Sequence, residues 1–194
     1  MNGRLAEVAA ATGGCLMGAD ATFAGVSIDS RTLKPGELFF ALRGEHFNGH
    51  AFVKAAVERG AAGAVVEMAG DTRLPQVVVK DTIAALAALA RAWRLRFHAT
   101  VIGVGGSNGK TTTKELLASV LGGAGPTLAT RGNLNNHLGV PLTLLRLAPA
   151  HRYAVIEMGA NHPGEIAALA AIAAPAIALV TNAGDEHLEG FGDL

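Results

Sequence analysis

The sequence predicts an α/β protein whose second half forms a mostly parallel sheet. Short apolar segments rich in β-branched residues alternate along the chain with segments in which apolar residues recur at helical spacing. One apolar segment, 100–102, leads through a glycine-rich loop into a strong helix-forming stretch. Half of the 194 residues are hydrophobic and 16% are charged, so we expect a packed core rather than disorder.

Residues 1–98 are expected to form the first of two domains. Gly13 and Gly60 stand where the first two helices should end, and a Lys-Pro-Gly turn at 34–36 separates the first two strands. The expected elements are a helix at 5–11, strands at 23–29 and 37–42, a helix at 50–59, strands at 64–67 and 76–79, and a helix at 83–97.

Residues 99–194 are expected to form a second domain around the glycine-rich loop. Its expected elements are strands at 100–102, 127–129, 153–158 and 176–181, and helices at 110–121, 141–147 and 165–173. Apolar strands that alternate with helices indicate a mostly parallel sheet. Four strands are fewer than nucleotide-binding sheets usually have, so we interpret the second domain as incomplete.

Composition excludes several classes of protein. Sixteen Lys and Arg residues balance sixteen Asp and Glu residues, which argues against a general nucleic-acid binder. A single cysteine, Cys15, rules out an internal disulfide framework. No stretch is apolar enough to span a membrane, and the segment before Cys15 is too short and too weakly apolar for an export signal. We therefore expect a cytoplasmic protein without membrane insertion.

The stretch 103–114, GVGGSNGKTTTK, has the layout of a phosphate-binding loop. Glycines bring backbone N–H groups against phosphate oxygens, and the helix N-terminus adds unpaired donors. Val104 occupies a position where the general motif has glycine, so the fitting pattern is G-x-x-G-x-x-G-K-T. The alternative is a flexible loop with a solvated lysine. The expected nucleotide contacts are Gly106, Ser107, Asn108, Gly109, Lys110, Thr111 and Thr112.

Two of these positions and two later ones suggest chemistry. Lys110 can reach the β- and γ-phosphates, and the Thr111 hydroxyl can bind Mg²⁺. Glu157 ends an apolar strand, where a carboxylate can bind the Mg²⁺ of the nucleotide. His187 follows the next apolar strand and should face the same crevice, as a ligand, a catalytic group or a solvated side chain. Lys110 and His187 are the catalytic candidates.

Two polar clusters suggest substrate contacts, although such residues are also common in plain turns. Asn135 and Asn136 belong to an asparagine-rich loop that could bind amide or phosphate groups of a substrate. In the first half, Arg31 suits a phosphate and Ser30 a ribose or base, and His50 lies in a second polar segment.

Together these motifs resemble the Mur ligase family of bacterial cell-wall synthesis, over the whole chain. The matching stretches, in family order, are 27–31, 36–44, 49–52, the phosphate loop, 132–146, 157–159 and 182–192. The resemblance implies that 1–98 binds a UDP-linked substrate and that 99–194 binds ATP. The asparagine-rich block points to the members that add D-alanyl-D-alanine.

The resemblance also implies a reaction. ATP phosphorylates the carboxylate of UDP-N-acetylmuramoyl-tripeptide, and the amine of D-alanyl-D-alanine then attacks the acyl phosphate to form a peptide bond. Lys110 would stabilise the transferred phosphoryl group, Thr111 and Glu157 would hold one Mg²⁺, and His187 a second. Ser30, Arg31, His50, Asn135 and Asn136 are carried over as substrate-binding residues. We expect a monomer.

The chain departs from the family pattern in three respects. Gly105 stands where threonine is frequent, and 185–186 is more acidic than usual before the histidine. Family members also continue into a carboxylated lysine and a C-terminal domain, so we interpret this chain as a truncated, inactive part of a ligase. A non-catalytic fragment that binds the UDP-substrate or nucleotide, and a folylpolyglutamate-synthetase-like ligase, remain the alternatives.

Overall fold

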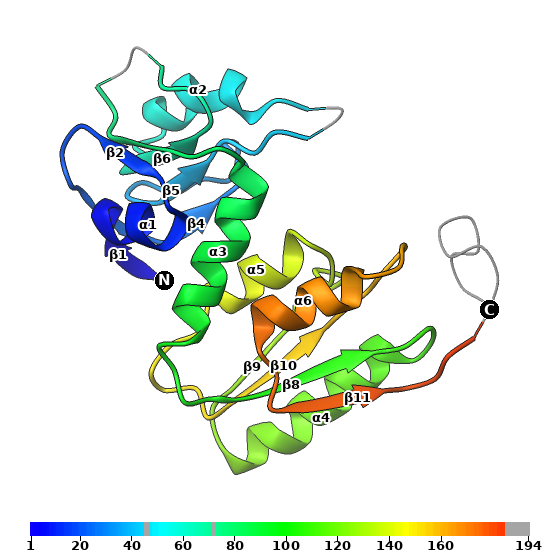
Figure 1. Cartoon of the computed structure of the whole chain (residues 1–194). Coiled ribbons are helices and arrows are strands. Elements are labelled where there is room, and N and C mark those ends of the chain that lie inside the picture. Colours follow the sequence, from blue (N-terminus) through cyan, green and yellow to red (C-terminus); the bar gives the residue numbers. More distant parts are fainter. Residues whose placement is uncertain (45–46, 71–72, 185–194) are drawn as a thin grey trace. The chain divides into compact units, whose positions relative to one another are not determined.

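A computed structural model describes residues 1–44, 47–70 and 73–184 (Figure 1). The chain divides into two compact units, Met1–Leu89 and Ala90–Leu194, and the division falls inside helix α3 (Thr82–Arg94). Both units combine helices with mainly parallel sheets, which confirms the predicted α/β class. None of the helices in the described part of the chain has the length and apolar character needed to span a bilayer.

The first unit contains a five-stranded sheet in the order β2-β7-β6-β5-β4, and a separate antiparallel pair, β1 and β3. Strands β4 to β7 run parallel, and β2 is antiparallel to β7. The elements before α3 are β1 (Asn2–Arg4), α1 (Leu5–Thr12), β2 (Cys15–Met17), β3 (Thr22–Ala24), β4 (Val26–Ser27), β5 (Leu38–Phe40), the 3-10 helix η1 (Gly49–Phe52), α2 (Val53–Glu58), β6 (Gly63–Val66) and β7 (Gln76–Val78).

Two features of this unit differ from the sequence-based expectation. The single strand expected at 23–29 is divided into β3 and β4 at Gly25, whose φ of 110° is a conformation that glycine adopts readily. Strands β1 and β2 were not predicted, because three residues are too few to show a period-two pattern. The core on one face of the sheet forms where Phe39, Ala64 and Val66 pack with Ala56 of α2.

The second unit contains a four-stranded, wholly parallel sheet in the order β11-β8-β10-β9. Helix α4 covers one face, and α5 and α6 cover the other (Figure 1). After α3 the elements are β8 (Thr100–Gly105), α4 (Lys110–Ala124), β9 (Thr127–Ala129), α5 (Gly139–Leu144), β10 (Tyr153–Glu157), α6 (Glu165–Ala173) and β11 (Ile177–Val180). Every element expected between 99 and 184 is present, with bounds that shift by a few residues.

The register of this sheet positions its polar loops. Glu157, the last residue of β10, is paired with Val104 of β8, immediately before the glycine-rich loop. Apolar side chains of α4, such as Leu117 and Leu121, pack on Val104 and Val155 and fix the helix over the sheet. The carboxyl ends of parallel strands lie at one edge, so Glu157 and the loop become neighbours.

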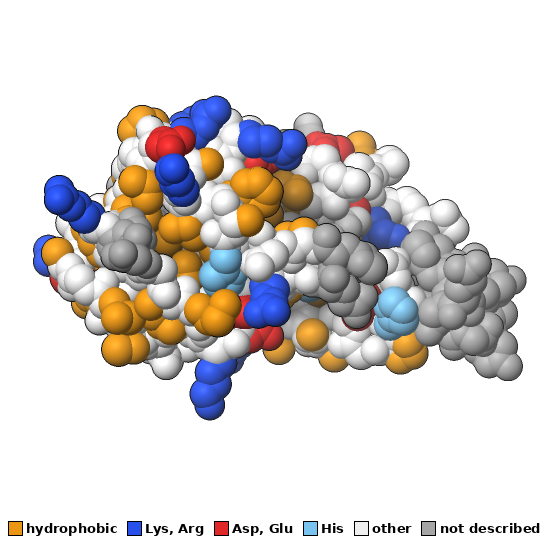
Figure 2. All heavy atoms as spheres, turned by 90° about the horizontal axis from the view of Figure 1, so that it is seen from above, with side chains coloured by type: hydrophobic (Ala, Val, Ile, Leu, Met, Phe, Trp, Pro, Cys, Tyr) orange, Lys and Arg blue, Asp and Glu red, His pale blue; other side chains and the backbone are white. Residues whose placement is uncertain are grey.

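Surface charge agrees with the balanced composition. On the face shown in Figure 2, Lys and Arg side chains are spread singly or in small groups among hydrophobic and neutral ones. Formal net charge is zero at pH 7.

Candidate nucleotide and substrate sites

The glycine-rich loop joins β8 to α4, as the sequence predicts. Gly106 and Gly109 have φ values of 124° and 79°, and a Cβ at position 106 would collide with the hydroxyl of Thr181. The ammonium of Lys110 donates to the carbonyl oxygens of Gly106 at 2.5 Å and Ser107 at 2.7 Å. The lysine therefore lies over its own loop, at the N-terminus of α4.

The segment after β11 holds the loop, a contact that sequence reasoning missed. The backbone N–H of Ser107 donates to the carbonyl of Asn182 at 3.1 Å, and the N–H of Asn108 donates to its side-chain Oδ1 at 2.9 Å. The Thr181 hydroxyl donates to the carbonyl of Asn108 at 2.6 Å. The one sequence signal for these contacts is that residues 181–182 lie at the end of a predicted strand, because the carboxyl ends of parallel strands lie at the same edge of the sheet as the loop. A phosphate bound by the same N–H groups would have to replace Asn182.

Glu157 is almost fully buried, with 1% of its surface exposed. Its Oε1 accepts hydrogen bonds from the Thr111 hydroxyl at 3.2 Å and the Asn135 side-chain amide at 2.9 Å. Its Oε2 is buried and has no hydrogen-bond partner among the residues that the structure describes. An ionised oxygen without a partner is costly inside a protein, so it needs a cation or a donor from a ligand.

This arrangement fits Mg²⁺, which prefers oxygen ligands. Within the described residues, no group of three or more His, Cys, Asp or Glu side chains is placed to hold a metal ion. Mg²⁺ needs no such cage, because it keeps several waters and binds one or two carboxylates together with phosphate oxygens. Glu157 and Thr111 supply that small set. His187 lies outside the described residues.

These groups line one cavity of about 690 Å³, which we call the loop cavity. It is lined by Lys110, Thr111, Asn133, Asn135, Asn136, His137, Glu157, Gly159, Ala160, Asn161, His162, Glu165, Ala168, Leu169 and Ile172. Five predicted site residues, Lys110, Thr111, Asn135, Asn136 and Glu157, therefore meet in one place. Predicted contacts 106–109 form the adjacent loop, and Thr112 is exposed on the first turn of α4.

The two predicted asparagines have different local roles. Asn135 reaches Glu157 through its side chain, and its carbonyl accepts the N–H of Gly159 at 2.9 Å. The side-chain Oδ1 of Asn136 accepts the N–H groups of Leu138 at 3.1 Å and Gly139 at 2.9 Å at the start of α5. Oδ1 of Asn136 thus satisfies backbone donors at a helix start, whereas Asn135 orients the carboxylate.

Sequence reasoning missed the polar group that begins α6. The carboxylate of Glu165 accepts the N–H of Asn161 at 2.6 Å and the N–H of His162 at 3.2 Å. The bond from the Asn161 backbone, more than any other cause, lowers the pKa of Glu165. A glutamate three residues after His162 at a helix start is the signal that could have indicated this turn.

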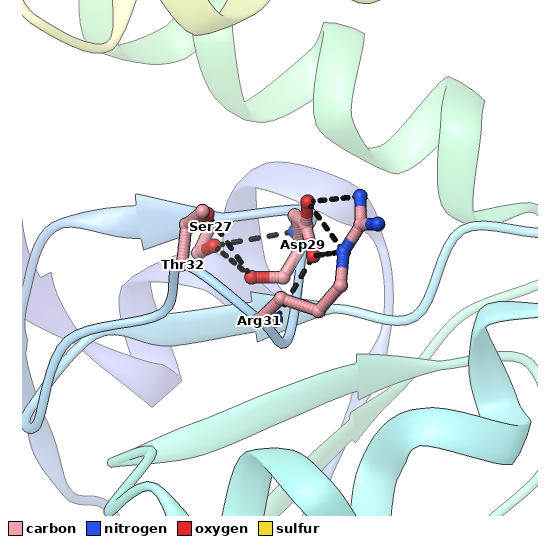
Figure 3. Close-up of polar contacts among 4 residues, drawn as sticks. All are labelled: Ser27, Asp29, Arg31 and Thr32. Atoms are coloured by element: carbon pink, nitrogen blue, oxygen red, sulfur yellow. Dashed lines mark hydrogen bonds and ion pairs between the residues drawn. The ribbon is translucent and has the colours of Figure 1, made fainter.

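In the first unit, Asp29 and Arg31 form a bidentate pair beside the strand end (Figure 3). Arg31 Nε donates to Asp29 Oδ1 at 2.9 Å and Nη2 donates to Oδ2 at 2.8 Å. Hydrogen bonding from the Arg31 side chain lowers the pKa of Asp29 from 3.8 to about 2. The guanidinium is held at a mostly exposed position, with 85% of the side-chain surface accessible.

A second cavity, of about 450 Å³, adjoins this pair, and we call it the aromatic cavity. Its lining residues are Ile28, Asp29, Ser30, Arg31, Phe39, Leu42, Phe47, Gly49 and Phe52. It includes the predicted Ser30 and Arg31 but not His50. Both ring nitrogens of His50 are engaged: Nε2 accepts the N–H of Glu67 at 2.8 Å, and Nδ1 lies 2.9 Å from Oδ1 of Asn48.

The parallel sheet, the glycine-rich loop and the carboxylate beside it form the layout that is typical of phosphate-loop proteins of the α/β class. A Mur ligase middle-domain model matches residues 104–194, and a model of the Mur ligase family catalytic domain matches residues 22–94. The chain belongs to the Mur ligase family, which confirms the resemblance seen in the sequence.

Individual relatives agree with this assignment. UDP-N-acetylmuramoyl-tripeptide–D-alanyl-D-alanine ligase of Escherichia coli (strain K12) is 50% identical over 181 residues, which are 93% of this chain and 40% of the relative. MurF from Acinetobacter baumannii superposes with a TM-score of 0.95 and 42% identity, over 99% of this chain and 43% of that one.

A third relative was solved with a nucleotide. MurF ligase from Thermotoga maritima, in complex with ADP, superposes with a TM-score of 0.77 and 36% identity, over 84% of this chain and 38% of that one. The chain spans about two fifths of the length of the curated relatives it matches.

Proposed function

We propose that this chain supplies the substrate-binding and ATP-binding parts of a ligase that adds D-alanyl-D-alanine to UDP-N-acetylmuramoyl-tripeptide. In this proposal residues 1–98 bind the UDP-linked substrate and residues 99–194 bind ATP. The observation that carries it is the buried Oε2 of Glu157, which has no partner within the described part of the chain and lies with Thr111 and Lys110 in the loop cavity. The names of the Escherichia coli and other relatives support the choice of substrates. We propose a cytoplasmic monomer.

The reaction would proceed in two steps. A carboxylate oxygen of the tripeptide attacks the γ-phosphorus of ATP, which releases ADP and leaves an acyl phosphate. The amine of D-alanyl-D-alanine then attacks the acyl carbon, the phosphate leaves, and the amine loses a proton. Both steps depend on positioning and charge neutralisation, which are the contributions a protein makes to phosphoryl transfer.

Residues of the loop cavity supply these contributions. The ammonium of Lys110, now bonded to loop carbonyls, would turn to the phosphoryl oxygens and neutralise charge as it transfers. The N–H groups of Ser107 and Asn108 would exchange Asn182 for phosphate oxygens. Glu157 and Thr111 would hold Mg²⁺, which as a bound Lewis acid polarises the phosphoryl group. We propose His187 as a further metal ligand and catalytic residue.

In the first unit, the aromatic cavity is the proposed place for the uridine end of the substrate. Exposed Phe47 and Phe52 offer apolar surface for a base, and buried Ser30 offers a hydroxyl for a ribose or base. Arg31 would exchange part of its pairing with Asp29 for a phosphate, a geometry that a guanidinium favours. His50 remains a proposed contact through rearrangement of its loop, as do Asn135 and Asn136 for the peptide end.

Calorimetry on the 194-residue chain, and product analysis on an enzyme that contains it, test this proposal. We expect UDP-N-acetylmuramoyl-tripeptide and Mg²⁺–ADP to bind independently, with UDP-binding weakened in Arg31→Ala and ADP-binding weakened in Lys110→Ala. Failure of both ligands to bind would contradict the proposal. The 194-residue chain by itself should release no ADP, because residues 99–194 are interpreted as an incomplete ATP-binding domain. In an enzyme that contains this chain, binding without ADP release in the presence of ATP and D-alanyl-D-alanine would indicate the non-catalytic alternative. Glutamate-dependent ADP release by that enzyme with a folate would indicate the folylpolyglutamate-synthetase-like alternative.

A further inference from the structure

Lys114 is the most unusual buried group in the second unit that the proposed chemistry does not use. It lies one helical turn after Lys110 on α4, and none of its surface is exposed. Lysine usually buries its stem and keeps its ammonium in water. Here the ammonium lies inside, where it donates to the carbonyl of Thr130 at 2.9 Å and pairs with the carboxylate of Glu115 at 2.6 Å.

Thr130 connects this lysine to Glu157. The pairing of β9 with β10 ends at Ala129 opposite Val155, and Thr130 follows directly. The N–H of Thr130 donates to the carbonyl of Val155 at 3.0 Å, and its side-chain Oγ1 accepts the N–H of Glu157 at 3.0 Å. The threonine hydroxyl thus extends the β9–β10 hydrogen bonding past the end of β9 to Glu157.

We propose that Lys114 is a positioning residue that, through Thr130, fixes the backbone of Glu157 and so the direction of its carboxylate. The inference rests on the proposed role of Glu157 as a metal ligand. Only the lysine of this ion pair is buried, because 66% of the Glu115 side-chain surface is exposed. A buried charged side chain is seldom required for stability, because a well-packed apolar side chain of similar volume commonly serves the fold as well. An apolar residue, however, cannot donate a hydrogen bond to the Thr130 carbonyl and so cannot fix its position.

Four variants of the 194-residue chain test each link. Lys114→Met keeps the stem and removes the charge, and Thr130→Val keeps the shape and removes the hydroxyl. Thr130→Ser restores the hydroxyl, and Lys80→Met is the control because Lys80 is an exposed lysine. Hydrogen exchange of the Glu157 amide, measured by NMR in the absence of metal, reports whether the Glu157 backbone is held in place. Calorimetric titration of ADP at several Mg²⁺ concentrations reports the metal site, and thermal melting reports stability.

We expect Lys114→Met and Thr130→Val to speed exchange of the Glu157 amide. Each should also raise the Mg²⁺ concentration for half-maximal ADP binding by about tenfold, a size typical of groups that orient metal ligands. Thr130→Ser and Lys80→Met should behave like the unaltered chain. A folded Lys114→Met variant with a lower melting temperature but unchanged amide exchange and Mg²⁺ dependence would overturn the proposal and leave a purely structural lysine.

Two further outcomes are separable. If Lys114→Met does not fold, Thr130→Val tests the proposal instead. Unchanged amide exchange and Mg²⁺ dependence in Thr130→Val would show that Thr130 does not position Glu157, and would overturn the proposal.

The Mg²⁺ dependence of ADP binding is also measured for Glu157→Gln. If Glu157→Gln leaves the Mg²⁺ dependence unchanged, the metal assignment in the proposed function fails, while amide exchange still tests whether Lys114 and Thr130 position this residue.

Discussion

Asn135 and Glu157 are joined by a hydrogen bond of 2.9 Å from the side-chain amide to Oε1, although 22 positions separate them in the chain. The Thr111 hydroxyl binds the same oxygen, so one side of the carboxylate is held by two donors. Oε2 is buried and finds no partner in residues 1–44, 47–70 and 73–184. The carboxylate is therefore fixed on one side and available on the other, which suits a ligand of a bound cation.

Asn135→Asp should make the second unit less stable without Mg²⁺ and more responsive to it. The substitution removes a donor to Glu157 and places two carboxylates together, which should cost about 1–3 kcal/mol. Mg²⁺ should recover most of that loss, because a divalent cation neutralises both groups. Urea unfolding with EDTA and with Mg²⁺ measures the difference. An equal Mg²⁺ effect on variant and unaltered chain would contradict the site assignment.

Lys110→Ala should weaken binding of ADP and ATP to the 194-residue chain at least about tenfold, because a phosphate loses a directly opposed charge. Lys80→Ala, at an exposed lysine of the first unit, is the matched control. Calorimetry gives both affinities, and circular dichroism checks that the fold is kept. Equal ADP affinities in the two variants would show that phosphate is bound elsewhere. In an enzyme that contains this chain, turnover should fall by orders of magnitude.

Asp29 should make the stability of the first unit depend on pH in the acid range. Its pKa in the folded protein is about 2, below its ordinary value of 3.8, so its contribution is complete above pH 4 and disappears as the pH falls towards 2. Asp29→Asn should remove that part of the pH dependence. Carbon-detected NMR of the carboxyl group gives the midpoint directly, and a midpoint near 3.8 would mean that the pair with Arg31 does not form in solution.

Two glycines in helices of the second unit should respond to alanine in opposite directions. A Cβ at Gly139, the first residue of α5, would collide with the backbone of Leu134, so Gly139→Ala should destabilise the unit by about 2 kcal/mol or more. Gly123 in α4 has open space around its Cα, and Gly123→Ala should stabilise by about 0.5–1 kcal/mol. Urea unfolding measures both, and a stabilising Gly139→Ala would contradict the close approach of Leu134 to Gly139.

Sequence patterns were sufficient for the class of fold, for the family and for the loop. Hydrophobic periodicity is a local property, and it located the long elements such as α3 and α4 within a few residues. It failed for β1, β2 and the break at Gly25, where three-residue strands and one backbone angle leave too little pattern. Glycine spacing with Lys110 and Thr111 predicted the phosphate loop, because that motif encodes a local backbone shape.

Several features were decided only by the tertiary structure. The sequence analysis joined Thr111 and Glu157 at one Mg²⁺ but did not connect Asn135 to them. The sheet register and the helix packing bring the side chains of both Thr111 and Asn135 to Oε1 of Glu157.

The contacts from Lys114 through Thr130 to Glu157 were likewise visible only in the tertiary structure. A lysine within a helical pattern is normally predicted to be exposed to solvent. The sequence by itself determined what the longer local segments form and which family the chain belongs to. Burial, and the choice of partner for each buried polar group, depend on residues far apart in the chain, so only the folded structure decided them.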